Sequence, residues 1–203
     1  MSAKNFFSKL LDTIIVFFMQ IWLGGLRQKW SRWRWRKVLD NDSLIVPKID
    51  ERNLLSFLSD VNAHFYWTMD GPTHLFDSVQ PPIYAFNAYK VASEDGGVFR
   101  GDCDDCHAAI YHALQANGYD VALVTVITAP AGMSHTMCAI KTTGEDGKPV
   151  YRVADYNYLR GAYESMDAFA AAYETSKRRV RMWTLDKYDY QKQSYYPVDK
   201  ADF

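Results

Sequence analysis

GDCDDCHAAIYHALQANGYD, residues 101–120, is the stretch that decides the fold. Apolar residues follow Cys103 at helical spacing, and Gly118 stands where a left-handed helix end favours glycine. The next run, DVALVTVIT from Asp120, is apolar at alternating positions of both parities, which is typical of a buried strand. The stretch therefore predicts a helix that leads directly into the centre of a sheet.

Further elements are predicted on both sides of this helix. After it, HTMCAIKT and PVYRVADY read as two strands joined by the turn GEDGK, followed by a helix at 166–175 and the strand RRVRMWTL. Before it, Asp50 is expected to cap one helix, and a second is expected at 83–91, after a Pro-Pro pair. Helices first and then an antiparallel sheet indicate an α+β fold, with the Cys103 helix packed on the sheet.

The domain organisation follows from composition. With 203 residues, 48% of them hydrophobic, the chain is large enough for one globular core with appendages. We expect a hydrophobic and basic-aromatic arm at 1–37, a linker at 38–49, a catalytic-size domain at 50–185 and a Tyr-rich tail at 186–203. The tail reads as a surface wrap or a docking strap.

The arm differs in charge from the rest of the chain. Residues 1–37 hold eight Lys or Arg and one acid, Asp12, although the whole chain has a formal net charge of -1. An N-terminal hydrophobic helix is expected, followed by a belt of Trp and Arg suited to lipid headgroups and less suited to nucleic acid. The arm is thus an anchor to a membrane surface or to a partner protein. The anchor residues are Trp22, Trp30, Arg32, Trp33, Arg34, Trp35 and Arg36.

The three cysteines have different expected roles. An odd number of cysteines does not form a disulfide framework, so reduced thiols are expected. Cys103 stands at a helix N-terminus, where backbone N–H groups and the helix dipole favour a thiolate. Cys106 shares the apolar helix face and should be inert packing. The acids beside Cys103 oppose the thiolate unless a cation, such as calcium or a protonated histidine, neutralises them.

His135 and Asp155 are the predicted partners of that thiol. Glu145 lies midway between them, and a hairpin symmetric about it would place their Cβ atoms roughly 5 Å apart. At this separation a carboxylate can orient an imidazole. His107 and His112, on the Cys103 helix, are expected to point along the helix or away from the thiol.

Two other chemistries use the same residues. Cys103, Cys106, His135 and Cys138 resemble a zinc pattern, but residues three apart on a strand face opposite sides of the sheet. Cys103 and Cys106 could also form a redox pair, but the strand that should precede such a motif is missing from ASEDGGVFRGD. The nucleophile interpretation is therefore preferred, and these two remain alternatives.

Three motifs, GDCDD, SHTMCAI and YRVADYNY, resemble the Cys, His and Asp motifs of the transglutaminase-like, or papain-like, superfamily. Within it they are most similar to bacterial transglutaminase-like cysteine proteases of the LapG type. The resemblance spans roughly residues 81–161 and implies a papain-like core. It also implies that Cys103 is the nucleophile, His135 the general base and acid, and Asp155 its orienter.

The resemblance further implies a cofactor and a substrate class. Asp102, Asp104 and Asp105 would be calcium ligands, although Asp104 stands where this group tends to have Glu. The reaction would be cysteine-dependent acyl transfer on an amide bond of a protein or peptide, with water or an amine as acceptor. A peptidase or amidase is favoured over a cross-linking transglutaminase.

A non-catalytic protein is the alternative from another class. In that case the arm would carry the function, as in a membrane-associated or assembly component of a phage or secretion system. Either way the arm predicts association with a membrane, in a cell envelope or a virion. Deletion of residues 1–37 is expected to leave an enzyme active but to abolish the role of a docking protein.

Overall fold

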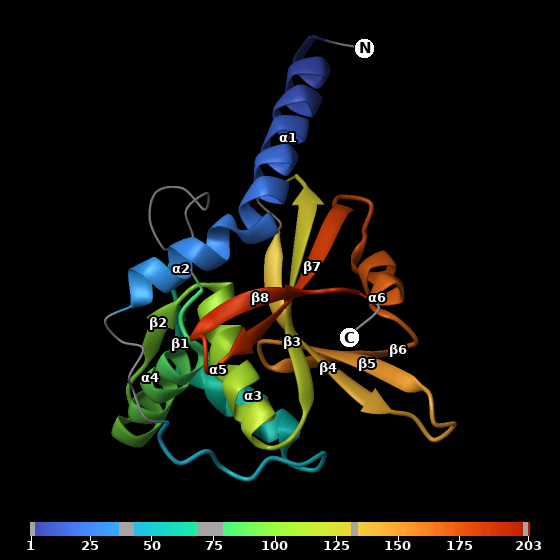
Figure 1. Cartoon of the computed structure of the whole chain (residues 1–203). Coiled ribbons are helices and arrows are strands. Elements are labelled where there is room, and N and C mark those ends of the chain that lie inside the picture. The colour runs from blue at the N-terminus through green and yellow to red at the C-terminus, as the bar shows by residue number, and fades with distance from the viewer. Residues whose placement is uncertain (1–2, 37–42, 69–78, 131–133, 201–202) are drawn as a thin grey trace.

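The computed structural model describes residues 3–36, 43–68, 79–130, 134–200 and 203. The fold is mixed α+β, with an antiparallel sheet as its centre (Figure 1). Its helical elements are α1 (Ala3–Ile21), η1 (Trp22–Leu26), α2 (Arg27–Trp35), α3 (Leu54–Ala63), α4 (Pro82–Asp95), α5 (Cys103–Ala116) and α6 (Met166–Tyr173). Its strands are β1 (Phe65–Trp67), β2 (Phe99–Gly101), β3 (Asp120–Ala129), β4 (His135–Thr143), β5 (Pro149–Asp155), β6 (Tyr158–Tyr163), β7 (Arg179–Asp189) and β8 (Ser194–Val198).

The main sheet has six strands in the order β6-β5-β4-β3-β7-β8, and each neighbouring pair is antiparallel. Side chains alternate along β3, so that Leu123 enters one core cluster and Val124 the other. Helices α3, α4 and α5 cover the first face, and α6 covers the second. A separate pair of short parallel strands, β1 and β2, leads into α5.

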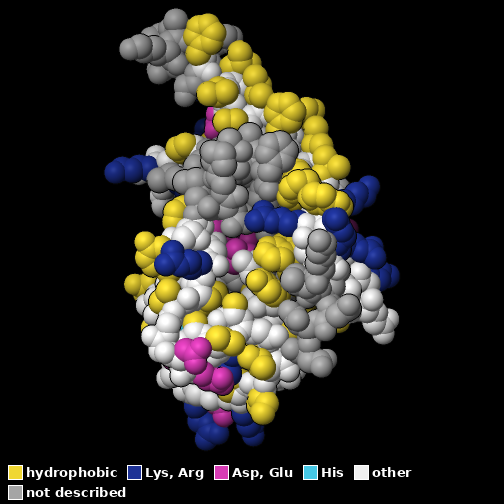
Figure 2. Space-filling view, turned by 90° about the vertical axis from the view of Figure 1, so that its left-hand side faces the viewer, with side chains coloured by type: hydrophobic (Ala, Val, Ile, Leu, Met, Phe, Trp, Pro, Cys, Tyr) yellow, Lys and Arg dark blue, Asp and Glu magenta, His cyan; other side chains and the backbone are white. Residues whose placement is uncertain are grey.

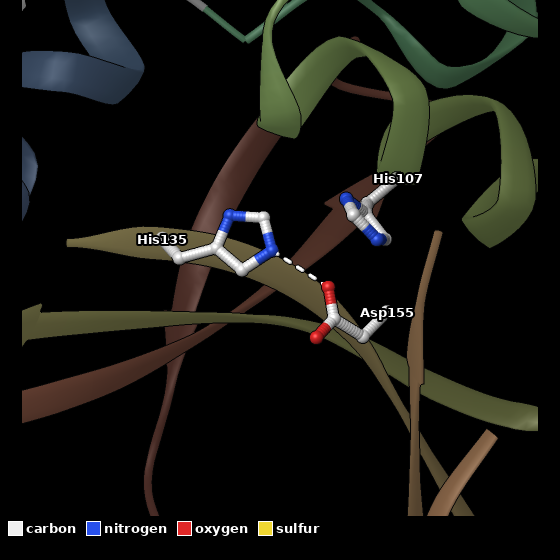
Figure 3. Close-up of side chains that lie close together, drawn as sticks. All are labelled: His107, His135 and Asp155. Atoms are coloured by element: carbon white, nitrogen blue, oxygen red, sulfur yellow. Dashed lines mark hydrogen bonds and ion pairs between the residues drawn. The ribbon is translucent and has the colours of Figure 1, made fainter. Parts of the chain in front are cut away.

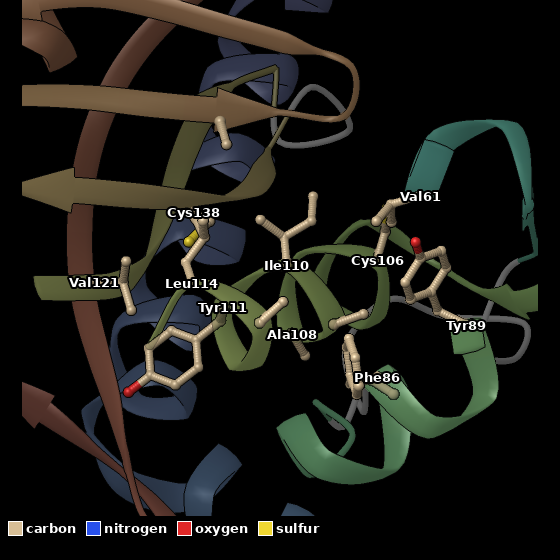
Figure 4. Packing of buried hydrophobic residues seen from close by; sticks show 14 of the residues in the cluster. Val61, Phe86, Tyr89, Cys106, Ala108, Ile110, Tyr111, Leu114, Val121 and Cys138 are labelled. Carbon is tan, nitrogen blue, oxygen red and sulfur yellow. The ribbon is translucent and has the colours of Figure 1, made fainter. Parts of the chain in front are cut away.

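Helix α5 lies in the centre of the first layer. Every residue from Asp104 to Leu114 is buried, as expected of a helix enclosed on all sides. Ile110 and Leu114 pack between the sheet and α4, with Cys106 and Phe86 in the same cluster (Figure 4). The prediction of a central helix on an antiparallel sheet is confirmed.

Two expectations concern the segment before α3. Asp50 caps the turn that leads into α3, because its carboxylate accepts the N–H groups of Arg52 and Asn53 and its carbonyl oxygen accepts Leu54 N–H. The linker expected at 38–49 stays a prediction, and in its described part Leu44 N–H donates to Asn87 and Ile49 N–H to Asn117. Residues 37–42 of that linker lie outside the described part of the chain.

The prediction for the Tyr-rich tail is wrong. Instead of wrapping over the surface, it extends β7 to Asp189 and returns as the edge strand β8. Tyr195 pairs in register with the buried Tyr188, and its hydroxyl donates to Gln80 O at 2.9 Å. The alternating tyrosines belong to the core.

The arm consists of two parts with different surroundings. Helix α1 extends away from the body, whereas α2 lies against it (Figure 1). Arg27, Gln28 and Ser31 of α2 are buried, and the Trp35 ring lies 5.1 Å from that of Tyr84. Among the helices in the described residues, none is both long and apolar enough to cross a membrane.

Candidate active site

The candidate site lies where the start of α5 meets the ends of β4 and β5. Asp102 caps α5, and its side chain accepts the N–H of Asp104. Cys103, the first helical residue, is half-buried, whereas Cys106 and Cys138 are fully buried thiols. Burial raises the pKa of both buried thiols, and for Cys106 the nearby Asp105 adds to the effect. The assignment of Cys106 to packing is confirmed.

His135 and Asp155 are in direct contact. His135 Nε2 lies 2.8 Å from Asp155 Oδ1 (Figure 3). The hairpin register, however, pairs Cys138 with Ala154 and Thr143 with Pro149, so its midpoint is Asp146 rather than Glu145. The two residues are therefore diagonal on one face instead of opposite each other, since a shift of two residues preserves the face.

Asp155 is held from both sides. Its Oδ2 accepts Arg160 Nε at 2.7 Å and lies 2.6 Å from the Arg160 NH2 group. Burial alone would raise the pKa of Asp155, but its hydrogen bond with His135, the proximity of His107 and the hydrogen bond with Arg160 hold it below its usual range. The carboxylate is thus ionised and fixed in orientation.

His107 points along α5, one of the two orientations expected for it, and it makes contacts that the sequence did not indicate. Its Nδ1 lies 2.5 Å from Cys103 O, and its Nε2 accepts the backbone N–H of Tyr156 at 2.9 Å. Burial, with a smaller contribution from the nearby His135, lowers its pKa to about 3, so the ring is neutral and carries its proton on Nδ1. His107 thus joins the first turn of α5 to the end of β5.

Tyr156 completes the wall of the site. Its ring stacks on His135 with the centroids 5.4 Å apart. Its backbone lies in the left-handed region at φ 54°, which is uncommon for a residue with a large side chain. The hydrogen bond to His107 and the stack on His135 stabilise this conformation. Strain of this kind concentrates at functional sites.

Two groups of possible metal ligands occur in the described residues. One is His107, His135 and Asp155, and the other is Asp102, Asp104 and Asp105, with ligand atoms within 4.8 Å of one another in each group. Neither group contains a cysteine, so the zinc pattern is not assembled. In the first group His107 Nε2 already accepts a backbone N–H, and both rings are engaged in hydrogen bonds.

The protein itself already engages one oxygen of each carboxylate in the acidic group. Asp104 Oδ2 is bound by the guanidinium of Arg27, and Asp105 Oδ1 accepts Gln80 N–H at 3.1 Å. Asp102 Oδ1 is used for the helix cap. Arg27 therefore supplies the cation that the sequence left unassigned, and no signal in the sequence could have identified it, because it lies 77 residues from Asp104.

The predicted anchor residues divide into two sets. Trp33 is 56% exposed, and Arg32, Arg34 and Arg36 are exposed as well. Trp22, Trp30 and Trp35 are only half-exposed, with Trp30 stacked on Trp33 and Trp35 packed on Tyr84. Of the four expected Trp residues, Trp35 thus packs on the body and Trp33 faces solvent.

The chain matches no family model, no curated protein and no solved structure.

Proposed function

We propose that the protein is a cysteine peptidase or amidase with a papain-like core and the triad Cys103, His135 and Asp155. The observation that carries this proposal is the 2.8 Å contact of His135 Nε2 with an ionised, buried Asp155, beside a helix that begins with Cys103. Because Nε2 of His135 is hydrogen-bonded to Asp155, Nδ1 of the same ring remains to exchange a proton with the thiol and the substrate.

The chemistry follows from these roles. His135 Nδ1 accepts the thiol proton as Cys103 Sγ attacks the carbonyl carbon of an amide. His135 then gives this proton to the departing amine, and a thioester remains on Cys103. Water, deprotonated by His135, hydrolyses the thioester and releases the acid. With a primary amine in place of water, the product is a cross-link.

Labelling with iodoacetamide tests the triad. We expect Cys103 to react faster at neutral pH than the buried Cys106 and Cys138, and His135→Ala to slow this reaction roughly tenfold or more. Each rate is divided by the rate of the same cysteine in urea, which removes differences of intrinsic reactivity. The matched control is His64→Ala, because His64 lies at the end of α3 and bonds Asp60 O.

The outcomes are distinct. Equal Cys103 labelling in wild type and His135→Ala would contradict the proposal, since exposure alone would then explain the reaction. If His135→Ala slows the labelling of Cys103 as expected, peptide libraries and a fluorescent primary amine distinguish hydrolysis from cross-linking. Incorporation of the amine without release of new peptide termini would favour the transglutaminase.

A second role, docking on an anionic membrane surface, is favoured by α1. Seven large side chains repeat along one side of it at heptad spacing, and all of them are 43% exposed or more. This apolar stripe consists of Phe7, Leu10, Leu11, Ile14, Phe17, Phe18 and Ile21. Figure 2 shows hydrophobic side chains along α1, with Lys and Arg beside its base.

The surroundings of the stripe favour lipid as the occupant. On another side of α1, Asp12 lies 3.5 Å from Arg181 of β7, with a side chain only 19% exposed. Beyond the stripe come the exposed cations of α2 and Trp33, whose ring lies 4.9 Å from the Arg36 guanidinium. An apolar face next to cations and an exposed indole suits a helix lying in a headgroup layer.

Sedimentation with vesicles tests this role. The protein should bind vesicles with an anionic lipid and bind phosphatidylcholine vesicles much more weakly. Ile14→Glu with Phe17→Glu should weaken binding at least roughly tenfold, because two apolar side chains leave the lipid. Val91→Glu is the control, since Val91 is 51% exposed on α4. A stripe that mediates self-association without lipid binding would contradict this role.

A further inference from the structure

Arg27 is the residue that connects the arm to the start of the nucleophile helix. We infer that Arg27 is a positioning residue that takes the place of calcium beside Cys103, an inference that rests on the proposed function. Its guanidinium pairs with Asp104, and the two side chains are 6% and 1% exposed. A second guanidinium nitrogen lies 3.4 Å from Thr125 Oγ1 on β3.

The acidic start of α5 requires a cation. Asp102, Asp104 and Asp105 are all buried, and their carboxylate oxygens come within 4.8 Å of one another. Like charges this close, in a poorly solvated place, destabilise one another. The N-terminal helix dipole and the Arg27 guanidinium oppose this effect, and arginine keeps its charge at every working pH.

The arm holds Arg27 in place through its neighbours. Gln28 Nε2 donates to Asp186 Oδ1 at 3.0 Å and lies 3.3 Å from Leu23 O. Burial raises the pKa of Asp186, and Arg27 and Gln28 oppose this rise. Two successive residues of α2 thus contact acids on α5 and β7. The first turn of α5, and with it Cys103, is fastened to α2.

Deletion of the arm therefore has a different expected result from simple relocation of an enzyme. Removal of α2 would take away the only guanidinium that pairs with Asp104 among the described ion pairs. The acidic turn would then lose its compensation, and Cys103 would lose its fixed position relative to His135. A divalent cation is not needed as long as Arg27 is present.

Four full-length variants test the inference by Cys103 labelling at one pH. Arg27→Met should slow labelling roughly tenfold, because a buried carboxylate is left beside the thiol. Arg27→Lys should retain more of the rate than Arg27→Met, since it keeps the charge. Arg27→Met with Asp104→Asn should approach the wild-type rate, because no charge is left uncompensated. Arg181→Met should have no effect, because Arg181 of β7 pairs with Asp12 of α1 and not with the acids of α5.

Calcium is tested in the same assay. A chelator should leave the wild-type rate unchanged. A chelator that slows wild-type labelling, with calcium restoring it, would overturn the inference, as would wild-type labelling in a folded Arg27→Met variant. Circular dichroism reports folding. If Arg27→Met does not fold, the double variant decides: wild-type labelling supports charge compensation by Arg27, and labelling as slow as in His135→Ala overturns it.

A different result would overturn the proposed function itself. If His135→Ala leaves the labelling of Cys103 unchanged in the wild-type background, the triad is contradicted, whatever the Arg27 variants do. A dependence on His135 with no dependence on Arg27 overturns only the inference about Arg27.

Discussion

His107 accepts the backbone N–H of Tyr156 on Nε2, at 2.9 Å. The same ring faces the carbonyl oxygen of Cys103 through Nδ1. One neutral side chain thus fixes the distance between the first turn of α5 and the strand that carries Asp155. This arrangement leads to the first two predictions.

Replacement of His107 by Leu should destabilise the protein and slow Cys103 labelling. It leaves the Tyr156 N–H without its partner, at a cost of about 1–3 kcal/mol, and it removes the side-chain bond to the Cys103 carbonyl, which keeps its helical backbone bond. The free energy of unfolding in urea measures the effect. His64→Leu is the control, because that ring is half-buried and bonds a single helix carbonyl. Equal losses in the two variants would contradict the role given to His107.

Stability should fall as the pH is lowered from about 6.5. Burial lowers the pKa of His107 to about 3 and that of His112 to about 4, whereas both titrate near 6.5 in the unfolded chain. Below that pH the unfolded state binds more protons, so unfolding becomes easier. The slope is at most about 1.4 kcal/mol per pH unit for each histidine. Urea titrations at several pH values measure it.

His112→Gln should flatten this slope. His112 joins Ser43 Oγ and Tyr190 Oη, each at 2.8 Å, and lies far along α5 from Cys103. The variant removes one of the two depressed titrations and leaves the triad unchanged. A slope that is the same as in the wild type would show that His112 does not contribute.

Replacement of Asp155 by Asn should reduce amide hydrolysis by roughly 10²–10⁴-fold, because the His135 tautomer is no longer fixed. Initial rates on a cleaved peptide measure this loss. Arg160→Met should cost less than about tenfold, since the Arg160 side chain is 46% exposed and its charge is screened by solvent. A larger loss for Arg160 than for Asp155 would assign the orienting role differently.

Replacement of Gly101 by Ala should disturb the start of α5. A Cβ at this position would lie 2.4 Å from Asp105 Oδ2 and 2.5 Å from Asp105 Cβ. We expect a loss of about 1–3 kcal/mol in the free energy of unfolding and slower Cys103 labelling. The matched control is Gly97→Ala, where the nearest atom would be Ala92 O at 4.0 Å. A neutral Gly101→Ala would show that Asp105 moves without cost.

The main elements of the fold could be predicted because they depend on local patterns. The apolar run of β3, the turn before Lys148 and Gly118 after α5 each mark an element through periodicity or backbone geometry. The sequence did not predict the C-terminal strand β8, because tyrosine side chains occur both at the surface and in the core of proteins. Only their pairing with β7 decides between the two.

The site was predictable only in part. Cys103, His135 and Asp155 could be proposed from element ends and face parity, and a two-residue error in register did not separate the last two. His107 and Arg27 could not be found in this way. Helical periodicity predicts the direction in which a side chain points from the helix axis, but it does not predict which distant segment of the chain packs against that side of the helix.

The junction η1 gives the arm a further property. Its backbone follows a π-helical path, and Gly25 lies at φ 127°, a conformation that side chains oppose. On one side α1 projects into solvent, and on the other Arg27 is locked in the core within two residues of this glycine. Gly25 therefore lets the chain change direction between α1 and α2 without distorting the segment that holds Arg27, and any larger residue at this position would be strained.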